Sequence, residues 1–310
     1  MRYRPGVRRR IDAGTFLILT PLLWGATFPA TKIALRHIQV PTFMAWSRVL
    51  GFLTVLAMIP LLRRADGKRN RLLREVMGPG LVLGALMFAG YVLQTEGQAR
   101  TTATNTGFIT GLYVVFAPIL AAVFLRLRVS GSIWVAVLVS LAGLALLSIR
   151  DLGQVRLYAG DLLVLAGAVV WAGHITAVGH FAPRFSAWML SLAQMGAATA
   201  FHLILAATAG IHVRPSFSLR VWPLLLLNGV LGSGVGFAIQ VLAQQTVTPG
   251  RAVVLLAGES LFAAFFAAIW IGERLSAHQW LGAVLVLAAM AYSELSARRP
   301  REALVDPAIP

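Results

Sequence analysis

The sequence predicts an all-α integral membrane protein whose ten transmembrane helices form two inverted five-helix repeats. Hydrophobic residues make up 58% of its 310 residues and charged residues only 12%, and the mean hydropathy is +0.78. A soluble protein of this length needs far more polar surface to cover its core, so lipid is the expected solvent. Apolar runs long enough to cross a bilayer follow one another along the chain, and its two halves share sequence patterns.

Ten apolar runs approach the roughly 20 residues that a membrane-spanning helix needs. They cover about 15–35, 42–62, 76–98, 105–125 and 132–149 in the first half, and about 161–181, 186–209, 221–243, 252–271 and 277–295 in the second. We expect a basic cytoplasmic tail over 1–14, a first repeat over 15–150, an inverted second repeat over 151–296 and a cytoplasmic tail over 297–310. The first run is longer than the apolar core of a signal peptide, about 7–15 residues, and is interpreted as a span.

The basic residues indicate how the chain is oriented. The formal net charge is +16, from 27 Lys and Arg against 11 Asp and Glu, and the cations gather at the ends of apolar runs. This distribution favours the positive-inside rule over nucleic-acid binding. With the N-terminus in the cytoplasm, 18 Lys and Arg lie inside, seven lie outside, and Lys32 and Arg48 fall within spans. We therefore expect a multi-pass protein of the plasma (inner) membrane with both termini in the cytoplasm.

Segments of the first half recur in the second. LLWGATFPATKIAL is similar to VVWAGHITAVGHFA, and the polar pattern of span three recurs in span eight. The matches place Trp24 over Trp171, Gln94 over Gln240 and Gln98 over Gln244. Because each half has an odd number of spans, the second copy must lie upside down relative to the first. Inverted repeats are typical of transporters, in which one half rocks against the other and exposes a central site to alternate sides.

With these features the chain resembles the drug/metabolite transporter (DMT) superfamily, and specifically its ten-span EamA-type family. The matching segments are WGATFPATKIAL with Arg48, GDLLVLAGAVVWA, GFITGLYVVFAPILAA and GRAVVLLAGESLFAAFFAAIWIGERLSAHQWLGAVLVL, and the similarity covers about residues 13–295. The resemblance implies export or exchange of a small metabolite through a central cavity, and scaffold roles for spans five and ten. Glu259 is followed by Ser260, where the family usually has proline, so the resemblance does not extend to a proline kink there.

Three ionisable side chains inside spans are candidates for function, because such groups are costly in lipid unless a partner or water meets them. Lys32 and Arg48 either extend to the headgroups or form a positive lining suited to a carboxylate or phosphate group. Glu259 lies near the middle of span nine. It is either a structural partner of Arg48, a neutral hydrogen-bonded acid, or a carboxyl group that couples proton movement to transport.

Polar side chains also recur with helical spacing on one face of several spans. The stripes are Tyr91, Gln94 and Gln98 on span three, Ser233, Gln240 and Gln244 on span eight, and Thr106, Thr110 and Tyr113 on span four. Such stripes either line a cavity or join helices by hydrogen bonds, and their recurrence in both halves favours lining. Asn228 has the same two interpretations, and the glycines around it favour close packing.

Span one carries a further signal, because Pro29 removes a backbone hydrogen bond and allows the helix to kink. Its Trp24 and Thr27 match Trp171 and His174 in span six. Taken together, the residues expected to contact substrate are Trp24, Thr27, Lys32, Arg48, Tyr91, Gln94, Gln98, Thr110, Tyr113, Trp171, His174, Gln240 and Gln244.

The expected function is a secondary transporter that exports a small metabolite by alternating access, with proton coupling through Glu259 as an option. An amino acid or another aromatic or zwitterionic compound is the favoured substrate. The alternative is a channel or a membrane-embedded sensor without coupled transport, although no charged ring or filter loop typical of channels occurs. Motifs of hydrolases and nucleotide-binding loops are also missing, so we expect neither an enzyme nor a cofactor. The expected partners are the substrate and the lipid bilayer, with no nucleic acid and the oligomeric state left open.

Overall fold

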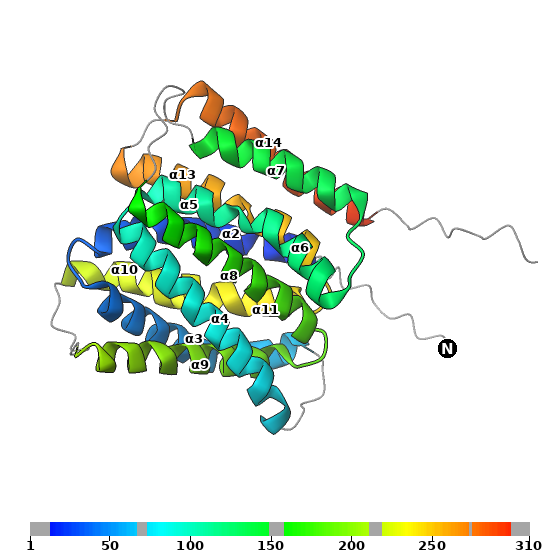
Figure 1. Ribbon diagram of the computed structural model, residues 1–310. Coiled ribbons are helices and arrows are strands. Elements are labelled where there is room, and N and C mark those ends of the chain that lie inside the picture. The colour runs from blue at the N-terminus through cyan, green and yellow to red at the C-terminus, as the bar shows by residue number, and fades with distance from the viewer. Residues whose placement is uncertain (1–12, 67–72, 149–157, 211–218, 273–274, 299–310) are drawn as a thin grey trace, which may run out of the picture.

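Helices make up the regular structure throughout the part of the chain that the structure describes. The computed structural model describes residues 13–66, 73–148, 158–210, 219–272 and 275–298. The tails predicted over 1–14 and 297–310 therefore lie almost entirely outside the described residues. The elements, shown in Figure 1, are α1 (Ala13–Leu17), α2 (Leu19–Ala34), α3 (Val40–Asp66), α4 (Leu73–Ala99), α5 (Ala103–Gly111), α6 (Tyr113–Leu125), α7 (Gly131–Ser148), α8 (Ala159–Phe181), α9 (Ala187–Thr208), η1 (Leu219–Val221), α10 (Trp222–Leu226), η2 (Leu227–Gly236), α11 (Phe237–Ala243), α12 (Pro249–Leu256), α13 (Gly258–Ile271) and α14 (Ala277–Arg298).

Among the described residues, eight segments are long and apolar enough to cross a membrane. They match predicted spans one to four and six to nine, and cover Ala13–Ala34, Val40–Asp66, Arg74–Ala99, Ala103–Leu125, Ala159–Phe181, Ala187–Thr208, Leu219–Ala243 and Pro249–Trp270. A shorter apolar helix covers Gly131–Leu147, within α7. The 22-residue α14 is not among the eight. The all-helical membrane fold is thus confirmed, whereas α7 and α14 as spans five and ten stay a prediction.

Several spans are interrupted where the sequence predicts continuous helices. Span four divides at Leu112 into α5 and α6, and span nine divides at Ala257 into α12 and α13. These two breaks fall at nearly equivalent positions of the repeat when Gln98 is placed over Gln244. Span eight contains η2, a π-helix of 10 residues that includes four glycines. Such wide winding is rare and is often found at functional sites.

The helices pack in matching pairs, as two related halves predict. α4 of span three packs against α8 of span six, and η2 of span eight packs against α2 of span one. Likewise, α4 packs against α9, and η2 packs against α3. α7 and α14 pack against each other along one edge of the bundle (Figure 1).

The backbones of α7 and α14 touch at a pair of glycines. A Cβ atom on Gly143 would lie 2.7 Å from the carbonyl oxygen of Gly282, and a Cβ atom on Gly282 would lie 2.6 Å from that of Gly143. Real Cβ atoms do not approach so closely, so only glycine permits this crossing. Close backbone packing at small residues is typical of membrane helices, because lipid tails provide no hydrophobic force that drives helices together.

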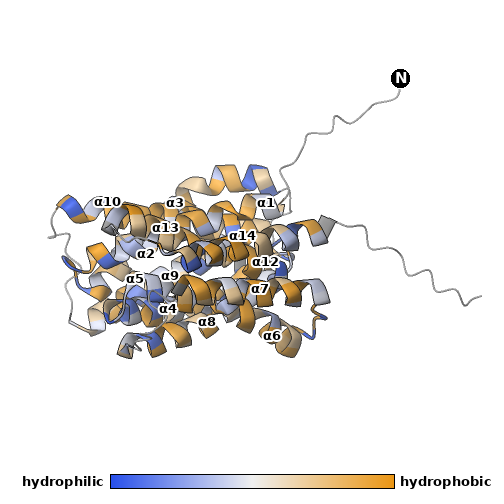
Figure 2. Cartoon of the chain, turned by 90° about the horizontal axis from the view of Figure 1, so that it is seen from above, coloured by the Kyte–Doolittle hydropathy of each residue, from blue (hydrophilic) through white to orange (hydrophobic). Residues whose placement is uncertain are grey.

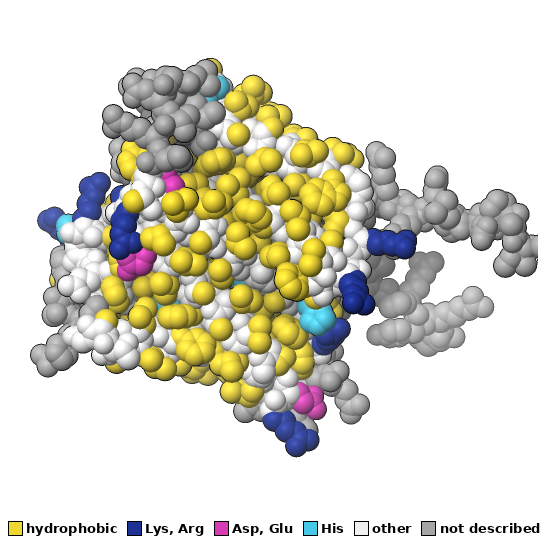
Figure 3. All heavy atoms as spheres, viewed as in Figure 1, with side chains coloured by type: hydrophobic (Ala, Val, Ile, Leu, Met, Phe, Trp, Pro, Cys, Tyr) yellow, Lys and Arg dark blue, Asp and Glu magenta, His cyan; other side chains and the backbone are white. Residues whose placement is uncertain are grey.

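The outer surface has the division expected of a protein in a bilayer. Apolar side chains cover the flank of the bundle, and Lys and Arg gather toward its two ends (Figure 3). Hydrophobic residues also dominate the helices seen from above (Figure 2). Phe124 and Leu162 are each 74% exposed. Lipid tails cover such side chains, while the basic residues meet the polar interfaces.

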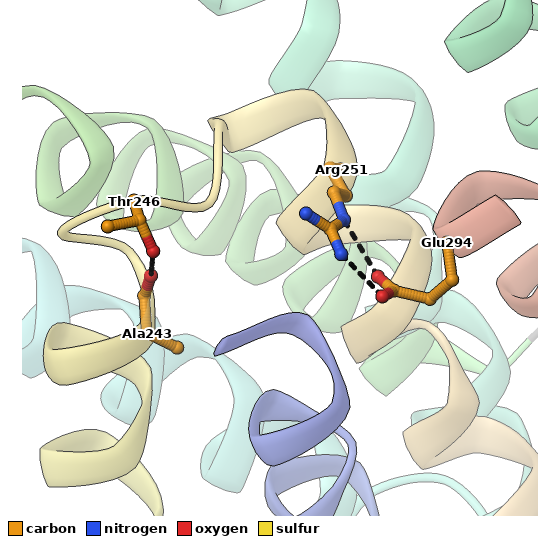
Figure 4. A network of polar contacts seen from close by, with 4 residues as sticks. All are labelled: Ala243, Thr246, Arg251 and Glu294. Carbon is orange, nitrogen blue, oxygen red and sulfur yellow. Dashed lines mark hydrogen bonds and ion pairs between the residues drawn. The ribbon is translucent and has the colours of Figure 1, made fainter. Parts of the chain in front are cut away.

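A bidentate ion pair joins span nine to α14 (Figure 4). Arg251 Nε donates to Oε1 of Glu294 over 2.7 Å, and Nη2 of the same arginine bonds the second carboxylate oxygen. Close by, the Thr246 hydroxyl donates to the Ala243 carbonyl over 3.4 Å in the turn after α11. Bidentate pairs fix orientation as well as adding attraction, so this contact anchors α14 to the bundle.

Candidate functional site

A cavity lies at the centre of the bundle, between spans one, three, four, six, eight and nine. The space in it that the centre of a water molecule can occupy is about 40 Å³. The lining residues are Trp24, Thr27 and Phe28 on α2, Tyr91 and Gln94 on α4, Thr110 on α5, Tyr113 on α6, Trp171, His174 and Ile175 on α8, Phe237 on α11 and Glu259 on α13. No residue of α7 or α14 is in the lining.

Most residues predicted to contact substrate share this space. Those that line the cavity are Trp24, Thr27, Tyr91, Gln94, Thr110, Tyr113, Trp171 and His174, together with the coupling candidate Glu259. Five others lie elsewhere, namely Lys32, Arg48, Gln98, Gln240 and Gln244. Contact of any of them with a substrate stays a prediction, but the structure brings the first group together around one hollow.

Three lining residues were not singled out from the sequence, namely Phe28, Ile175 and Phe237. All are apolar residues within apolar runs, where composition carries no signal. The internal repeat, however, aligns each of them with another residue that lines the cavity. With Gln94 over Gln240, Phe237 falls over Tyr91, and with Trp24 over Trp171, Ile175 falls over Phe28. The cavity is therefore lined by equivalent positions from the two halves.

Aromatic rings form one wall of the cavity around Phe237. The Trp24 ring lies 4.8 Å from the Phe237 ring centre, and the Trp171 ring stacks on Phe237 at 5.8 Å. Tyr91 meets Trp171 edge-on at 4.9 Å. Such tilted and offset arrangements are the favourable ones for aromatic pairs. The wall therefore presents a cluster of aromatic rings to the cavity.

Hydrogen bonds fix the orientation of the two tryptophans. Trp24 Nε1 donates to the Gly232 carbonyl in η2 over 2.9 Å, and Trp171 Nε1 donates to Gln94 Oε1 over 2.6 Å. The indole of Trp24 comes so near η2 that a Cβ atom on Gly236 would lie 2.5 Å from Nε1. Buried indole N–H groups need such acceptors, and glycine makes room for one of them.

Glu259 and Tyr113 form an unsatisfied polar patch on the facing side. Their exposed fractions are 3% and 1%. Oε1 of Glu259 and the hydroxyls of Tyr113 and Thr110 have no hydrogen-bond partner in the described part of the chain. Tyr113 and Glu259 line the same cavity, and neither the phenol nor Oε1 of the carboxyl group makes a hydrogen bond among the described residues. Buried polar groups are normally satisfied, so this patch suits a polar ligand or water.

His174 adds a nitrogen that is also without a partner. Its Nε2 lies 3.2 Å from Oε1 of Gln194 on α9, and its Nδ1 makes no hydrogen bond among the described residues. A single imidazole beside one carboxyl group does not make a metal site. Within the described ranges, no group of three or more His, Asp or Glu side chains could hold a metal ion.

Arg48 lies outside the lining, behind the Tyr91 ring. Its guanidinium carbon stands 3.5 Å from the centre of that ring, and Nη2 donates to the Ser233 hydroxyl over 2.5 Å. The side chain is 2% exposed, and Nε and Nη1 have no partner among the described residues. Arg48 therefore does not extend to the headgroups, and it bonds Ser233 instead of Glu259. Its charge acts on the cavity from behind the aromatic wall.

None of the remaining glutamines of the predicted stripes lines the cavity, and two of them bond other helices. Gln98 Nε2 donates to the Phe28 carbonyl over 2.8 Å, and Gln244 Nε2 donates to the Ile175 carbonyl over 2.9 Å. Gln240 Nε2 donates to Gln244 Oε1 over 2.9 Å. For Gln98 and Gln244, the structure matches the alternative of interhelical hydrogen bonding, whereas Gln240 bonds within its own span.

Lys32 binds the end of a neighbouring helix. Its Nζ donates to the carbonyl oxygens of Gln98 at 2.8 Å, Ala99 at 3.3 Å and Thr101 at 2.6 Å. The last carbonyls of a helix lack intrahelical partners and carry the negative end of its dipole, so a cation there is favourable. The lysine thus ties α2 to the C-terminal end of α4.

Asn228 likewise joins helices. Its Oδ1 accepts from the Thr31 hydroxyl over 2.9 Å, and its Nδ2 donates to the Leu224 carbonyl over 2.9 Å. The glycines of η2 allow close contact: a Cβ atom on Gly232 would lie 2.7 Å from Cγ2 of Thr27. The packing interpretation of this segment is the one that the structure supports.

Comparison with known proteins identifies relatives over nearly the whole chain. The profile of the EamA-like transporter family matches twice, over residues 13–149 and 158–293. An "Uncharacterized transporter" of Archaeoglobus fulgidus is 32% identical over 91% of this chain and 85% of its own length. A "Probable terminal-alkyne amino-acid exporter" of Streptantibioticus cattleyicolor is 27% identical over 83% of this chain and 84% of its own length. "Uncharacterized transporter YoaV" of Bacillus subtilis is 21% identical over 87% and 92%, respectively.

A solved structure shares the fold. One crystal structure of a protein with 17% sequence identity matches with a TM-score of 0.72, over 92% of this chain and 98% of that one. At this identity the likeness concerns the arrangement of the helices alone.

Proposed function

The chain belongs to the EamA-like transporter family, and on that premise we propose that it exports an amino acid or another small aromatic or zwitterionic metabolite. Family membership, the relatives named as transporters and the apolar spans make it a multi-pass membrane transporter of the drug/metabolite type. The observation that carries the proposal is the central cavity, where stacked rings and a carboxyl group without an ion partner among the described residues face the same space.

The lining favours a ligand with a planar or apolar part and a cationic group. The rings of Trp24 and Trp171 offer π faces, and a cation on such a face gains about 0.5–2 kcal/mol, depending on desolvation. Glu259 offers an acceptor for an ammonium group. Arg48, behind Tyr91, supplies a positive potential that favours a carboxylate nearby. A zwitterion satisfies both charges, and the relative named as an amino-acid exporter supports the same class.

Transport by alternating access requires two halves that move against each other around the cavity. In this proposal, residues 15–150 form one half and residues 151–296 form the second, inverted half. Both termini lie in the cytoplasm, and the membrane is the plasma membrane. The matched packing of equivalent helices supports such a division, because it gives each half the same set of contacts with the other.

Glu259 provides a means to couple efflux to proton entry. A buried carboxylate costs several kcal/mol unless it is neutralised. A proton or the ammonium group of a substrate can neutralise it, but not both together. Binding of substrate from the cytoplasm then releases a proton, and a proton from outside displaces the substrate.

Two measurements on the purified protein test this function. A thermal-shift screen against a metabolite panel first identifies ligands, because binding to the folded state raises the apparent stability. Compounds that stabilise the protein are then followed in proteoliposomes. We expect uptake that saturates, shows counterflow and responds to an imposed pH gradient. Ohmic current that ignores the pH gradient would favour a channel, and binding without flux would favour a sensor.

A further inference from the structure

Gln98 and Gln244, which the repeat places over each other, make the same hydrogen bond in the two halves. Gln98 Nε2 donates to the carbonyl oxygen of Phe28 over 2.8 Å, and Gln244 Nε2 donates to that of Ile175 over 2.9 Å. Phe28 and Ile175 are themselves equivalent positions, and both line the cavity. Each glutamine is only 1% exposed. The same donor and the same acceptor position therefore recur as a symmetric pair of interhelical bonds.

The two bonds lie toward opposite ends of the bundle. Gln98 is next to the end of α4, close to where α5 begins, whereas Gln244 directly follows α11. Figure 1 shows the α4–α5 junction and the end of α11 at opposite ends. Gln98 joins α4 to α2, and Gln244 joins α11 to α8. Loss of either bond therefore frees the cavity wall at one end only.

One equivalent position makes the two ends unequal. Where the first half has Lys32, the second half has Gly179. Lys32 reinforces the contact between α2 and α4 with three hydrogen bonds to backbone carbonyls, at 2.6 to 3.3 Å. Bonds from a charged donor are about twice as strong as neutral ones. The Gln98 end is thus held by an amide and an ammonium group.

At the Gln244 end, glycine provides packing in place of charge. A Cβ atom on Gly179 would lie 2.5 Å from Cγ of Pro249, so the start of α12 rests directly on the α8 backbone. Across α8 and α11, the bond from Gln244 is the neutral amide contact described above. The next residue, Gln245, donates from Nε2 to Oδ1 of Asp66 over 2.6 Å and to the Phe185 carbonyl over 3.2 Å, which ties α11 to α3 and to the turn before α9. Between α8 and α11, glycine stands at the position where the Gln98 end has the ammonium group of Lys32.

We infer that Gln98 and Gln244 are latches that close the two ends of the cavity, and that Lys32 makes the Gln98 latch the tighter one. The inference rests on the proposed transport function and on the orientation that places Lys32 near the outer surface. The empty transporter then opens mainly toward the cytoplasm, the side from which an exporter must load. The latches determine which side is open at rest, while the driving gradients determine net flux.

The sequence is suited to a direct test, because it contains no cysteine. A single reporter, Thr110→Cys, places a thiol in the cavity at a hydroxyl that makes no hydrogen bond among the described residues. The full-length protein in vesicles is treated with a membrane-impermeant maleimide from one side or the other, without substrate. The ratio of the two labelling rates reports which end is open.

Q98L and Q244L form a matched pair, because each removes one amide and keeps a side chain of similar size. An ordinary amide bond corresponds to about a threefold to tenfold change in an equilibrium. Q98L should raise labelling from outside by this factor, and K32M should raise it by about tenfold or more. Q244L should change the ratio in the opposite direction. A side chain that only stabilises the fold would not reverse the sidedness.

Shifts of the same sign in Q98L and Q244L, or an unchanged ratio in both, would overturn the inference. If a leucine variant fails to insert, Q98M and Q244M replace the pair with the same readout. Labelling needs no substrate, so the outcome is separate from that of the flux measurements. Flux without opposite shifts rejects the latches alone, and opposite shifts without flux of any tested compound reject the proposed transport alone.

Discussion

Within the cavity, single residues differ in whether the protein already satisfies their polar groups. The indoles of Trp24 and Trp171 have acceptors. In contrast, Oε1 of Glu259, the Tyr113 hydroxyl and Nδ1 of His174 have none among the described residues. A buried group without a partner costs about 1–3 kcal/mol. The second set is therefore where a ligand gains most by binding.

Glu259→Gln should abolish the dependence of flux on a pH gradient and leave substrate exchange intact. Glutamine has nearly the same shape, but it cannot release a proton. Substrate counterflow and flux driven by a pH gradient are both measured in the same preparation of proteoliposomes. Glu96→Gln is the matched control, because Glu96 lies at the end of α4 in a surface ion pair with Arg100 at 3.0 Å. If flux through Glu259→Gln still depended on the pH gradient, the coupling role would be rejected.

Helical spacing correctly predicted which side chains of a stripe line the cavity only where the helix runs alongside it. Tyr91 and Gln94 point into the hollow as expected, but Gln98, one turn further, lies at the end of α4 and meets the backbone of α2. A glutamine that lines a water-filled cavity and a glutamine that donates to a backbone carbonyl of another helix look the same in the sequence. Arg48 illustrates the same limit, because its position behind Tyr91 depends on tertiary packing.

At the scale of elements, the spans themselves could be predicted because bilayer thickness fixes their length. Their interruptions could not. The winding of η2 is associated with side chains from other spans, such as Trp24 bonded to the Gly232 carbonyl. The predicted stripe of Ser233, Gln240 and Gln244 assumed 3.6 residues per turn throughout, and Ser233 lies inside the π-wound segment. The Ser233 hydroxyl accepts from Nη2 of Arg48 over 2.5 Å, whereas Gln240 and Gln244 bond each other.

In Gly282→Ala, the added Cβ atom would collide with the α7 backbone. We expect this overpacking to lower the free energy of unfolding by about 1–3 kcal/mol. Gly78→Ala is the matched control within α4, where an added Cβ atom meets nothing within 4 Å. We expect that change to be neutral or to stabilise by up to about 1 kcal/mol. Thermal denaturation in detergent compares the two. Equal stabilities would show that the glycine crossing does not hold α7 to α14.

At the scale of the whole molecule, the apolar flank and the basic ends confirm a membrane protein but leave its orientation to the loops (Figure 3). The positive-inside count draws on segments such as 63–74, part of which lies outside the described residues. The repeat carries more information, because it pairs Tyr91 with Phe237 and Phe28 with Ile175 across the cavity. Symmetry therefore predicts more of the site than composition does.

Reporter fusions test the proposed orientation. A green fluorescent protein fused after Pro310 should fluoresce, because it folds in the cytoplasm. Alkaline phosphatase fused after Arg156, in the loop between spans five and six, should be active, because that loop is expected outside. The reverse pattern at both points would place Lys32 and the Gln98 latch at the cytoplasmic face. The resting transporter would then open outward.

The π-wound segment of span eight also affects how related chains should be aligned. A wide turn accommodates one more residue than an α-helical turn between the same two neighbours. A homologue that lacks one residue between Leu227 and Gly236 can therefore wind normally and still keep its later side chains in place. A one-residue gap in the middle of a transmembrane helix, which alignment methods usually penalise, is the expected mark of insertion or deletion in this stretch.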